Sequence, residues 1–200
     1  MSGYQEIDPC PYGAANAPPN LGRARQLIKQ AGAEGEAVRV LGSSQPEPKG
    51  ATEYLADVLT QIGLKARPRT VSDEVYGGLV SSAKTKAQAG LIAYFPDYPR
   101  PSSFSVLVSG DSIRPTNNLN AGNIDDPHIN RRLARADRNP NLDAVTRDYA
   151  AVDRRLVSEA HLAPYGQRKL SVFFSDRVDF EDCTVWHPVF NLDYAGPCLK

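Results

Sequence analysis

One short segment of the chain combines residue types that could bind a charged ligand. An apolar run at residues 91–95 leads into Pro96 and Asp97, and aromatic side chains stand on both sides of this carboxylate. A carboxylate can pair with an ammonium group while neighbouring rings pack against the adjacent apolar part of the ligand. The prolines would fix the backbone here at low entropic cost. The candidate ligand-binding residues are Tyr94, Phe95, Asp97, Tyr98, Ser103 and Phe104.

A simpler explanation of the same aspartate is equally compatible with the local pattern. Aspartate is common in turns because its side chain accepts hydrogen bonds from nearby backbone, so Asp97 could merely cap the turn. The ligand-binding hypothesis draws on position: in open α/β sheets, ligands lie beyond the carboxyl ends of the strands. A strand over residues 91–95 would place Asp97 at such an end.

The rest of the sequence predicts neither catalysis nor a cofactor. His128, His161 and His187 each lack a second ligand-type residue at a metal-binding spacing, so we expect no metal site. The sequence contains no glycine-rich phosphate loop and no nucleophile elbow. We therefore expect a protein that is not an enzyme and needs no cofactor.

The charge balance argues against a dedicated nucleic-acid binder. Lys and Arg number 23, Asp and Glu also number 23, and the formal net charge is zero. The arginines that gather at 131–138 and 154–155 have no interleaved aromatic residues on which bases could stack. We expect them to form solvated helix faces with local ion pairs.

The two ends of the chain bear on its compartment. The first residues show neither the basic region nor the apolar region of a signal peptide. Cys10, Cys183 and Cys198 fit no zinc or redox-pair spacing. A bridge between the ends in an oxidising compartment and three unpaired thiols both fit this pattern.

The first half of the chain predicts alternating helices and strands. A helix over 21–31 begins after Asn20 and stops at Gly32. A strand at 38–41 and a loop over 42–50 follow. An apolar face then predicts a helix over 51–62, and a strand over 64–71 contains Pro68, which favours a sheet edge or a bulge.

The second half continues this alternation. A short helix over 72–79 precedes the strand at 91–95. Asp126 caps a helix with Pro127 at its first position, and a longer helix begins after Asn141. Strand-like pieces follow at 170–174 and 185–190. Alternating strands and helices indicate a layered α/β domain.

The order of these segments resembles the C-terminal lobe of the family 5 extracellular solute-binding proteins, the peptide and oligopeptide receptors of ABC importers. The strongest segment, residues 94–104, is similar to the family's "Trp-x-x-Asp-Tyr-x-x-Pro-x-x-Phe". Here Tyr94 stands where the family usually has Trp. Four further segments fit in the same order: 21–32, 51–64, 117–137 and 147–164.

The resemblance implies one lobe of a periplasmic-binding-protein-like two-lobe fold whose N-terminal lobe is missing. Residues 1–19 would be the linker at the hinge crossover, 20–178 the α/β ligand-binding lobe, and 179–200 the return strand toward the missing lobe. The implied function is binding of a solute, most simply a peptide, for ABC-type import, with Asp97 holding the α-ammonium. The implied partners are that solute, the permease subunits and the missing lobe, with no nucleic acid.

The implied location of the whole protein is extracellular, at the cell surface or periplasmic. A second function stays open from the residues alone. The chain could be a stand-alone protein-interaction module that binds a partner through an exposed sheet edge and an apolar face.

Overall fold

The computed structural model of the chain describes residues 18–82, 84–85, 87–98, 100–165, 173–179, 183 and 198–200. These residues belong to two compact units. The sheet unit comprises the described residues up to 93 together with 106–130, and the helix unit comprises 94–105 and the described residues from 131 onward.

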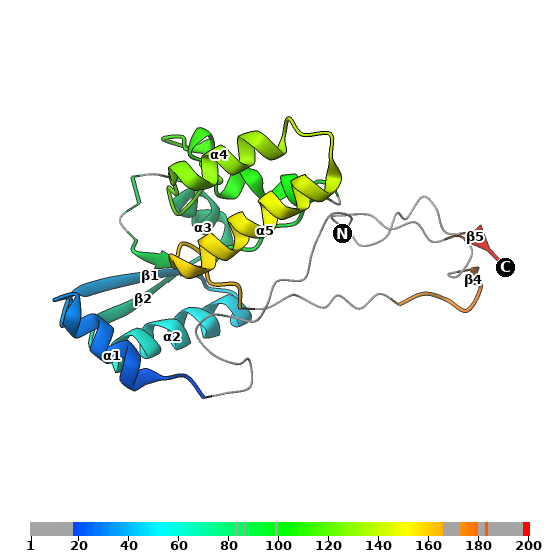
Figure 1. Ribbon diagram of the computed structural model, residues 1–200. Helices are drawn as coiled ribbons and strands as arrows, with labels where there is room; N and C mark the ends of the chain where they lie inside the picture. The colour runs from blue at the N-terminus through cyan, green and yellow to red at the C-terminus, as the bar shows by residue number, and fades with distance from the viewer. Residues whose placement is uncertain are drawn as a thin grey trace. The chain divides into compact units, whose positions relative to one another are not determined.

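The sheet unit is built on three parallel strands, β1 (Ala37–Ser43), β2 (Lys65–Val71) and β3 (Ala89–Gly90), in the order β2-β1-β3 (Figure 1). β2 pairs with β1 along its whole length, from Lys65 opposite Ala37 onward. β3 pairs with β1 at two positions. β2 is an edge strand within this sheet, as predicted from the proline at its centre, which can donate no ladder hydrogen bond.

Helices cover both faces of this sheet. α2 (Pro46–Gln61) connects β1 to β2, and α3 (Asp73–Val80) connects β2 to β3. The two connections run in opposite directions across the sheet, so right-handed crossovers place α2 and α3 on opposite faces (Figure 1). α1 (Leu21–Gln30) lies on the side of α2, where Arg25 Nε donates to the Gln61 carbonyl at 2.7 Å.

The core of the sheet unit depends on close approach between β1 and α2. Val40 and Leu41 are 0% and 2% exposed, and Thr52 and Ala56 are the buried residues of α2. A Cβ atom at Gly42 would lie 2.8 Å from the Thr52 Cβ. Only glycine at this position therefore allows the helix to pack so closely against the strand.

Two sequence-based boundaries in the sheet unit are wrong. The expected loop over 42–50 contains the first turn of α2, which begins at Pro46 rather than at residue 51. Prolines in a first helical turn cost little, because the amides they lack would have no partner there. The strand expected at 91–95 is wrong, since β3 ends at Gly90 and residues 91–95 belong to no strand, so Asp97 does not directly follow a strand as predicted.

A side-chain hydrogen bond marks the end of β3. The Tyr76 hydroxyl of α3 donates to the Leu91 carbonyl, so that carbonyl has a side-chain partner. Ile92 and Phe95 are 39% and 45% exposed, whereas a central strand would bury them. The apolar run is therefore a connector that leads to the candidate turn.

The helix unit is dominated by α4 (Pro127–Ala136), which begins in the sheet unit, and α5 (Leu142–Ser158). The predicted caps are confirmed: Asp126 Oδ1 accepts from the His128 amide at 2.7 Å, and Asn141 Oδ1 accepts from the Ala144 amide at 3.0 Å. The buried apolar residues of this unit come from both helices: Leu133, Ala136, Ala150, Val152 and Leu156.

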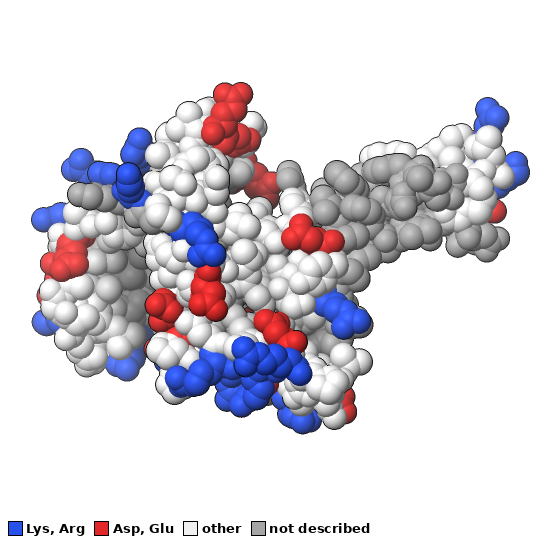
Figure 2. Space-filling model, turned by 90° about the horizontal axis from the view of Figure 1, so that it is seen from above, with Lys and Arg blue, Asp and Glu red and all other residues white. Residues whose placement is uncertain are grey.

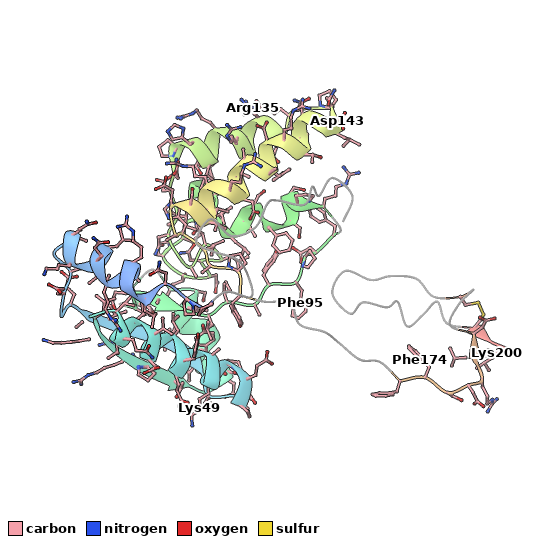
Figure 3. All side chains as sticks on the ribbon, turned by 60° about the horizontal axis from the view of Figure 1, so that its bottom comes forward. Lys49, Phe95, Arg135, Asp143, Phe174 and Lys200 are labelled. Atoms are coloured by element: carbon pink, nitrogen blue, oxygen red, sulfur yellow. A yellow bond between two sulfur atoms is a disulfide. The ribbon has the colours of Figure 1, made fainter. Side chains whose placement is uncertain are left out.

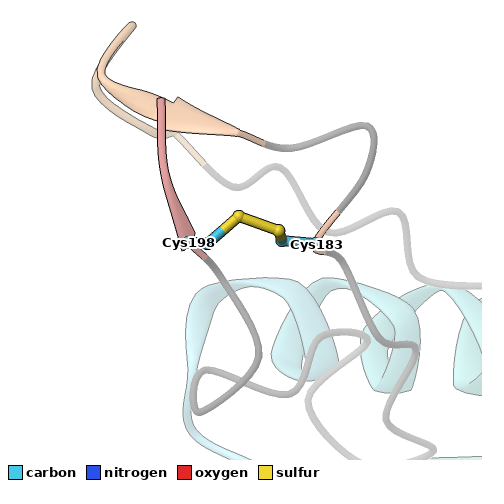
Figure 4. The surroundings of a disulfide bond; sticks show 2 residues. All are labelled: Cys183 and Cys198. Atoms are coloured by element: carbon cyan, nitrogen blue, oxygen red, sulfur yellow. A yellow bond between two sulfur atoms is a disulfide. The ribbon is translucent and has the colours of Figure 1, made fainter.

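The described residues near the C-terminus form a small pair of strands and a disulfide bond. β4 (Val178–Asp179) pairs antiparallel with β5 (Cys198–Leu199). Cys183 and Cys198, 15 residues apart, form a disulfide with their Cα atoms 5.6 Å apart (Figure 4). Both alternatives drawn from the spacing are wrong, because a bridge exists and it joins two cysteines near the C-terminus rather than the two ends of the chain. Cys10 lies outside the described residues.

The strand expected at 170–174 is wrong where the structure describes it. Phe173 belongs to no strand and is 92% exposed, and Phe174 also lies outside any strand. The remainder of that segment, the piece at 185–190 and most of the predicted hinge and return segments lie outside the described residues. Among the described helices, none is long and apolar enough to span a membrane.

Candidate functional site

The candidate turn lies at the start of the helix unit and is organised by three side-chain contacts. The Tyr94 hydroxyl donates to Asp97 Oδ2 at 3.1 Å, and the Asp97 amide donates to Ser103 Oγ at 2.8 Å. The rings of Tyr94 and Phe104 meet edge to face, with centroids 5.5 Å apart and planes 62° apart. Four of the six predicted residues are thus brought together.

The other two predicted residues lie on the surface of the same segment. Phe95 and Tyr98 are 45% and 44% exposed. Figure 3 labels Phe95 on the stretch of chain that enters the turn. Their aromatic surface is available to a ligand, and their role in binding stays a prediction.

The turn is anchored by a buried serine. Ser103 is 3% exposed and lies in the 3₁₀ helix η1 (Pro101–Leu107), with its own amide donating to the Arg100 carbonyl at 3.1 Å. Its hydroxyl fixes the Asp97 amide, so the backbone that carries the carboxylate is held from inside the unit. The Asp97 side chain is exposed and is therefore accessible to a ligand.

The electrostatics of the turn keep its phenol protonated. Partial burial raises the pKa of Tyr94, and the hydrogen bond to the Asp97 carboxylate and the charge of that carboxylate raise it further. A phenolate beside this carboxylate would be a second negative charge. Tyr94 therefore remains a hydrogen-bond donor throughout the physiological pH range.

An ion-pair cluster joins the two helices of this unit. The Asp148 side chain is 7% exposed, and Arg132 Nη1 lies 3.0 Å from its Oδ1. Arg135 Nε donates to Oδ2 at 2.7 Å, and a second nitrogen of Arg135 donates to Oδ1. The hydrogen bond from Arg135 lowers the pKa of Asp148 against the opposing effect of burial.

This cluster accounts for part of the arginine-rich face of α4. Two of its arginines pair with an aspartate that lies 13 and 16 positions away and is buried on α5, so these are not the local, solvated ion pairs that the sequence predicts; Arg155 and Glu159, four positions apart on α5, form a pair of that kind. Figure 2 shows acidic side chains interspersed among the basic groups on one face of the molecule.

A second polar feature, which the sequence-based analysis did not identify, is an asparagine-rich segment at residues 117–124 of the sheet unit. Asn120 is fully buried: its Nδ2 donates to the Ser109 and Ile124 carbonyls at 3.0 and 2.8 Å, and its Oδ1 accepts from the Ile124 amide at 2.9 Å. Asn118 is 1% exposed and donates to the Asn120 carbonyl and to Asn123 Oδ1. Four asparagines within seven residues, at positions 117, 118, 120 and 123, were the available signal.

The geometry of the asparagine-rich segment indicates a structural role. Every amide hydrogen of Asn120 already has a backbone partner, so nothing remains to offer a ligand. Among the described residues, no group of three or more His, Cys, Asp or Glu side chains could hold a metal ion.

Comparison with solved structures identifies the fold. The chain is similar to clavulanic acid biosynthesis oligopeptide binding protein 2, with 21% identity and a TM-score of 0.86 over 99% of this chain and 36% of that one. It also resembles the ABC transporter-associated periplasmic binding protein DppA from Helicobacter pylori, solved with the peptide STSA. There the identity is 18% and the TM-score 0.65 over 79% of this chain and 32% of that one.

A third similar structure is the dipeptide binding protein from Pseudoalteromonas sp. SM9913 in complex with Met-Leu. The sequence identity to this chain is 18% and the TM-score is 0.67, over 90% of this chain and 35% of that one. No family model matches the chain, and no curated protein matches its sequence. The chain spans about a third of the length of these three structures. At such identities the likeness shows the fold alone, and it confirms the predicted α/β lobe of a two-lobe fold.

Proposed function

We propose that this chain is the C-terminal lobe of a peptide receptor for ABC-type import, and that Asp97 binds the α-ammonium group of the peptide. The observation that carries the proposal is the turn itself. It presents an exposed carboxylate on a fixed backbone beside aromatic side chains, in a fold shared with proteins solved in complex with peptides. A charge-assisted hydrogen bond from an ammonium group to such a carboxylate is among the stronger polar contacts in proteins.

The proposal extends to the remainder of the receptor. Because the chain spans about a third of the similar structures, we propose that a further lobe completes the binding site. Residues 1–19 would lead from that lobe and 179–200 would return to it, with 20–178 forming the ligand-binding lobe. Permease subunits would be the other partners, and the protein would act outside the cytoplasmic membrane, in the periplasm or at the cell surface.

The disulfide supports that location. Disulfides persist in oxidising compartments and are rare in the cytosol, and this chain pairs Cys183 with Cys198. The similar structures are binding proteins, which supports a role other than catalysis.

The alternative function, a module that binds a partner through an exposed sheet edge, receives less support. Of the two edge strands in the sheet unit, β3 is two residues long, and β2 carries Pro68 at its centre and the exposed side chains of Lys65, Arg67 and Arg69. Prolines and charged residues on an edge strand oppose the addition of another strand.

The proposal can be tested by a thermodynamic cycle. The native peptide would be released by denaturing the whole protein that carries this chain and identified by mass spectrometry. Calorimetry would then compare the free peptide with its N-acetylated form on wild type and Asp97→Asn. We expect the substitution to weaken binding of the free peptide by about 1.5–3 kcal/mol, roughly ten- to a hundredfold.

The losses of affinity caused by Asp97→Asn and by N-acetylation of the peptide should not be additive. Acetylation should cost wild type a similar factor and cost Asp97→Asn little, because the partner of the ammonium group is already gone. Asp143→Asn is the matched control: this exposed carboxylate of the same unit, labelled in Figure 3, should leave both affinities unchanged. Equal affinities of wild type and Asp97→Asn for the free peptide would refute the proposal.

A further inference from the structure

The two carboxylate oxygens of Asp97 differ in their surroundings. Oδ2 accepts the Tyr94 hydroxyl at 3.1 Å. Within the described part of the chain, this is the side-chain hydrogen bond that Asp97 makes, and Oδ1 is left for an incoming donor. The carboxylate therefore presents one engaged oxygen and one available oxygen.

Two contacts fix the positions of the groups that produce this asymmetry. The Tyr94 ring packs edge to face against Phe104, which fixes the position of its hydroxyl. The Asp97 amide is bound by the buried Ser103 hydroxyl at 2.8 Å, which fixes the backbone of the acceptor. Donor and acceptor are thus anchored independently.

The two common organic cations in peptides use carboxylates differently. A guanidinium group is a planar fork that binds best when both oxygens of a carboxylate accept in parallel. An ammonium group is a compact point charge that needs a single oxygen. An oxygen that already accepts one hydrogen bond has a single lone pair left for the second arm of a fork, so that arm binds more weakly than at an unoccupied oxygen.

We propose that Tyr94 is a specificity-determining residue, because its hydroxyl makes Asp97 a one-point acceptor that selects ligands with a primary ammonium group over ligands with a guanidinium group. The inference rests on the proposed function and deepens it by naming the cation that the site prefers. Tyr94 acts on the ligand through Asp97. Removing the Tyr94 hydroxyl should therefore change the preference between the two cations more than the overall affinity for the ligand.

A paired peptide library tests this preference. A mixture of di- to pentapeptides would be divided, and the N-terminal ammonium of one half converted to a guanidino group. Both halves would be offered together to the whole protein, and the retained peptides quantified by mass spectrometry. Wild type should retain the ammonium forms over their guanidino counterparts. In Tyr94→Phe, which keeps the ring and removes the hydroxyl, that ratio should fall by about threefold to tenfold.

Two further variants separate this inference from the proposed function. Tyr54→Phe removes a hydroxyl from an exposed tyrosine of α2 and should keep the wild-type ratio. Asp97→Asn should lose retention of both forms. If Asp97→Asn loses both but wild type and Tyr94→Phe show the same ratio, the inference about Tyr94 is wrong and the proposed function stands. If wild type retains neither form, or if Asp97→Asn retains peptides like wild type, the inference about Tyr94 and the proposed function are both wrong.

Discussion

The candidate turn and the asparagine-rich segment are both short and polar, yet they use their hydrogen-bonding groups in opposite ways. In the turn, one oxygen of the exposed Asp97 carboxylate binds Tyr94 and the other is available. In the asparagine-rich segment, Asn120 is fully buried and its amide group is satisfied by three backbone groups. The first arrangement can bind a ligand, and the second can only stabilise the fold.

The contrast shows that the type of a polar residue does not identify a binding site. A buried amide with complete partners is a structural element, because exposing it to a ligand would require breaking its existing bonds. An exposed carboxylate on a fixed backbone can keep an unused hydrogen-bond acceptor at little cost to the stability of the fold. Substitutions that separate stability from binding are therefore the natural test of the comparison.

The largest effect on stability is expected at Asn120. Asn120→Ala leaves the Ser109 carbonyl and both the amide and the carbonyl of Ile124 without their side-chain partner. Because these groups are buried, we expect the free energy of unfolding to fall by about 3 kcal/mol. Urea denaturation monitored by circular dichroism would measure the change.

A nearby exposed residue provides the control for that substitution. Thr116→Ala, in the same stretch of chain, should change the free energy of unfolding by less than about 0.5 kcal/mol. An equally small effect for Asn120→Ala would show that the buried amide network is not what stabilises this segment.

A smaller and pH-dependent effect is expected at Asp148. Its arginine partners are 42% and 59% exposed and can be solvated when the carboxylate is lost, so Asp148→Asn should cost about 1–2 kcal/mol at neutral pH. The pKa of Asp148 is lowered in the folded protein, mainly by its hydrogen bond with Arg135. Its contribution is thus present above the unfolded pKa of about 3.9 and lost as the pH falls through the folded pKa.

Denaturation at a series of pH values checks the direction in which the contribution of Asp148 to stability changes with pH. The difference in unfolding free energy between wild type and Asp148→Asn should be constant near neutral pH and shrink below about pH 4. A difference that grows on acidification would contradict the assignment of Asp148 as an ionised partner of the two arginines.

The smallest effect is expected at Ser103, which links stability to binding within the turn. Ser103→Ala removes the acceptor of the Asp97 amide, so the carboxylate should become less well positioned. Affinity of the whole protein for its peptide should fall by about threefold to tenfold, and stability by about 1 kcal/mol. Ser44→Ala, at an exposed serine after β1, should leave both unchanged.

The parts of the fold that the sequence predicts are those that depend on neighbouring residues. Asn20, Asp126 and Asn141 cap helices through amides two or three positions away, so local pattern suffices to find them. The edge position of β2 follows from Pro68, which lacks a donor.

The parts that the sequence does not predict depend on distant residues. The end of β3 is marked by a hydrogen bond from Tyr76, 15 positions before Leu91. The burial of Asp148 requires Arg132 and Arg135 from another helix, and that of Asn120 requires the Ser109 carbonyl 11 positions away. Periodicity registers such polar residues as exposed, since it contains no information on their partners.

The candidate site is predicted from the sequence in part. Its residues lie within 11 positions of one another, so the pattern of an aspartate among aromatic residues could identify the segment. The pairing of Tyr94 with Asp97, rather than of another aromatic residue of the turn, needed the three-dimensional structure.

The most direct test of the central claim is to locate the peptide contact on the chain. Amide chemical shifts of the whole protein would be recorded by nuclear magnetic resonance without and with the native peptide. We predict that the largest changes within this chain occur at residues 94–104, including the Asp97 amide, while amides at 118–124 remain near their unbound positions. Changes concentrated at 118–124, with none at 94–104, would contradict the assignment of the turn as the ligand contact.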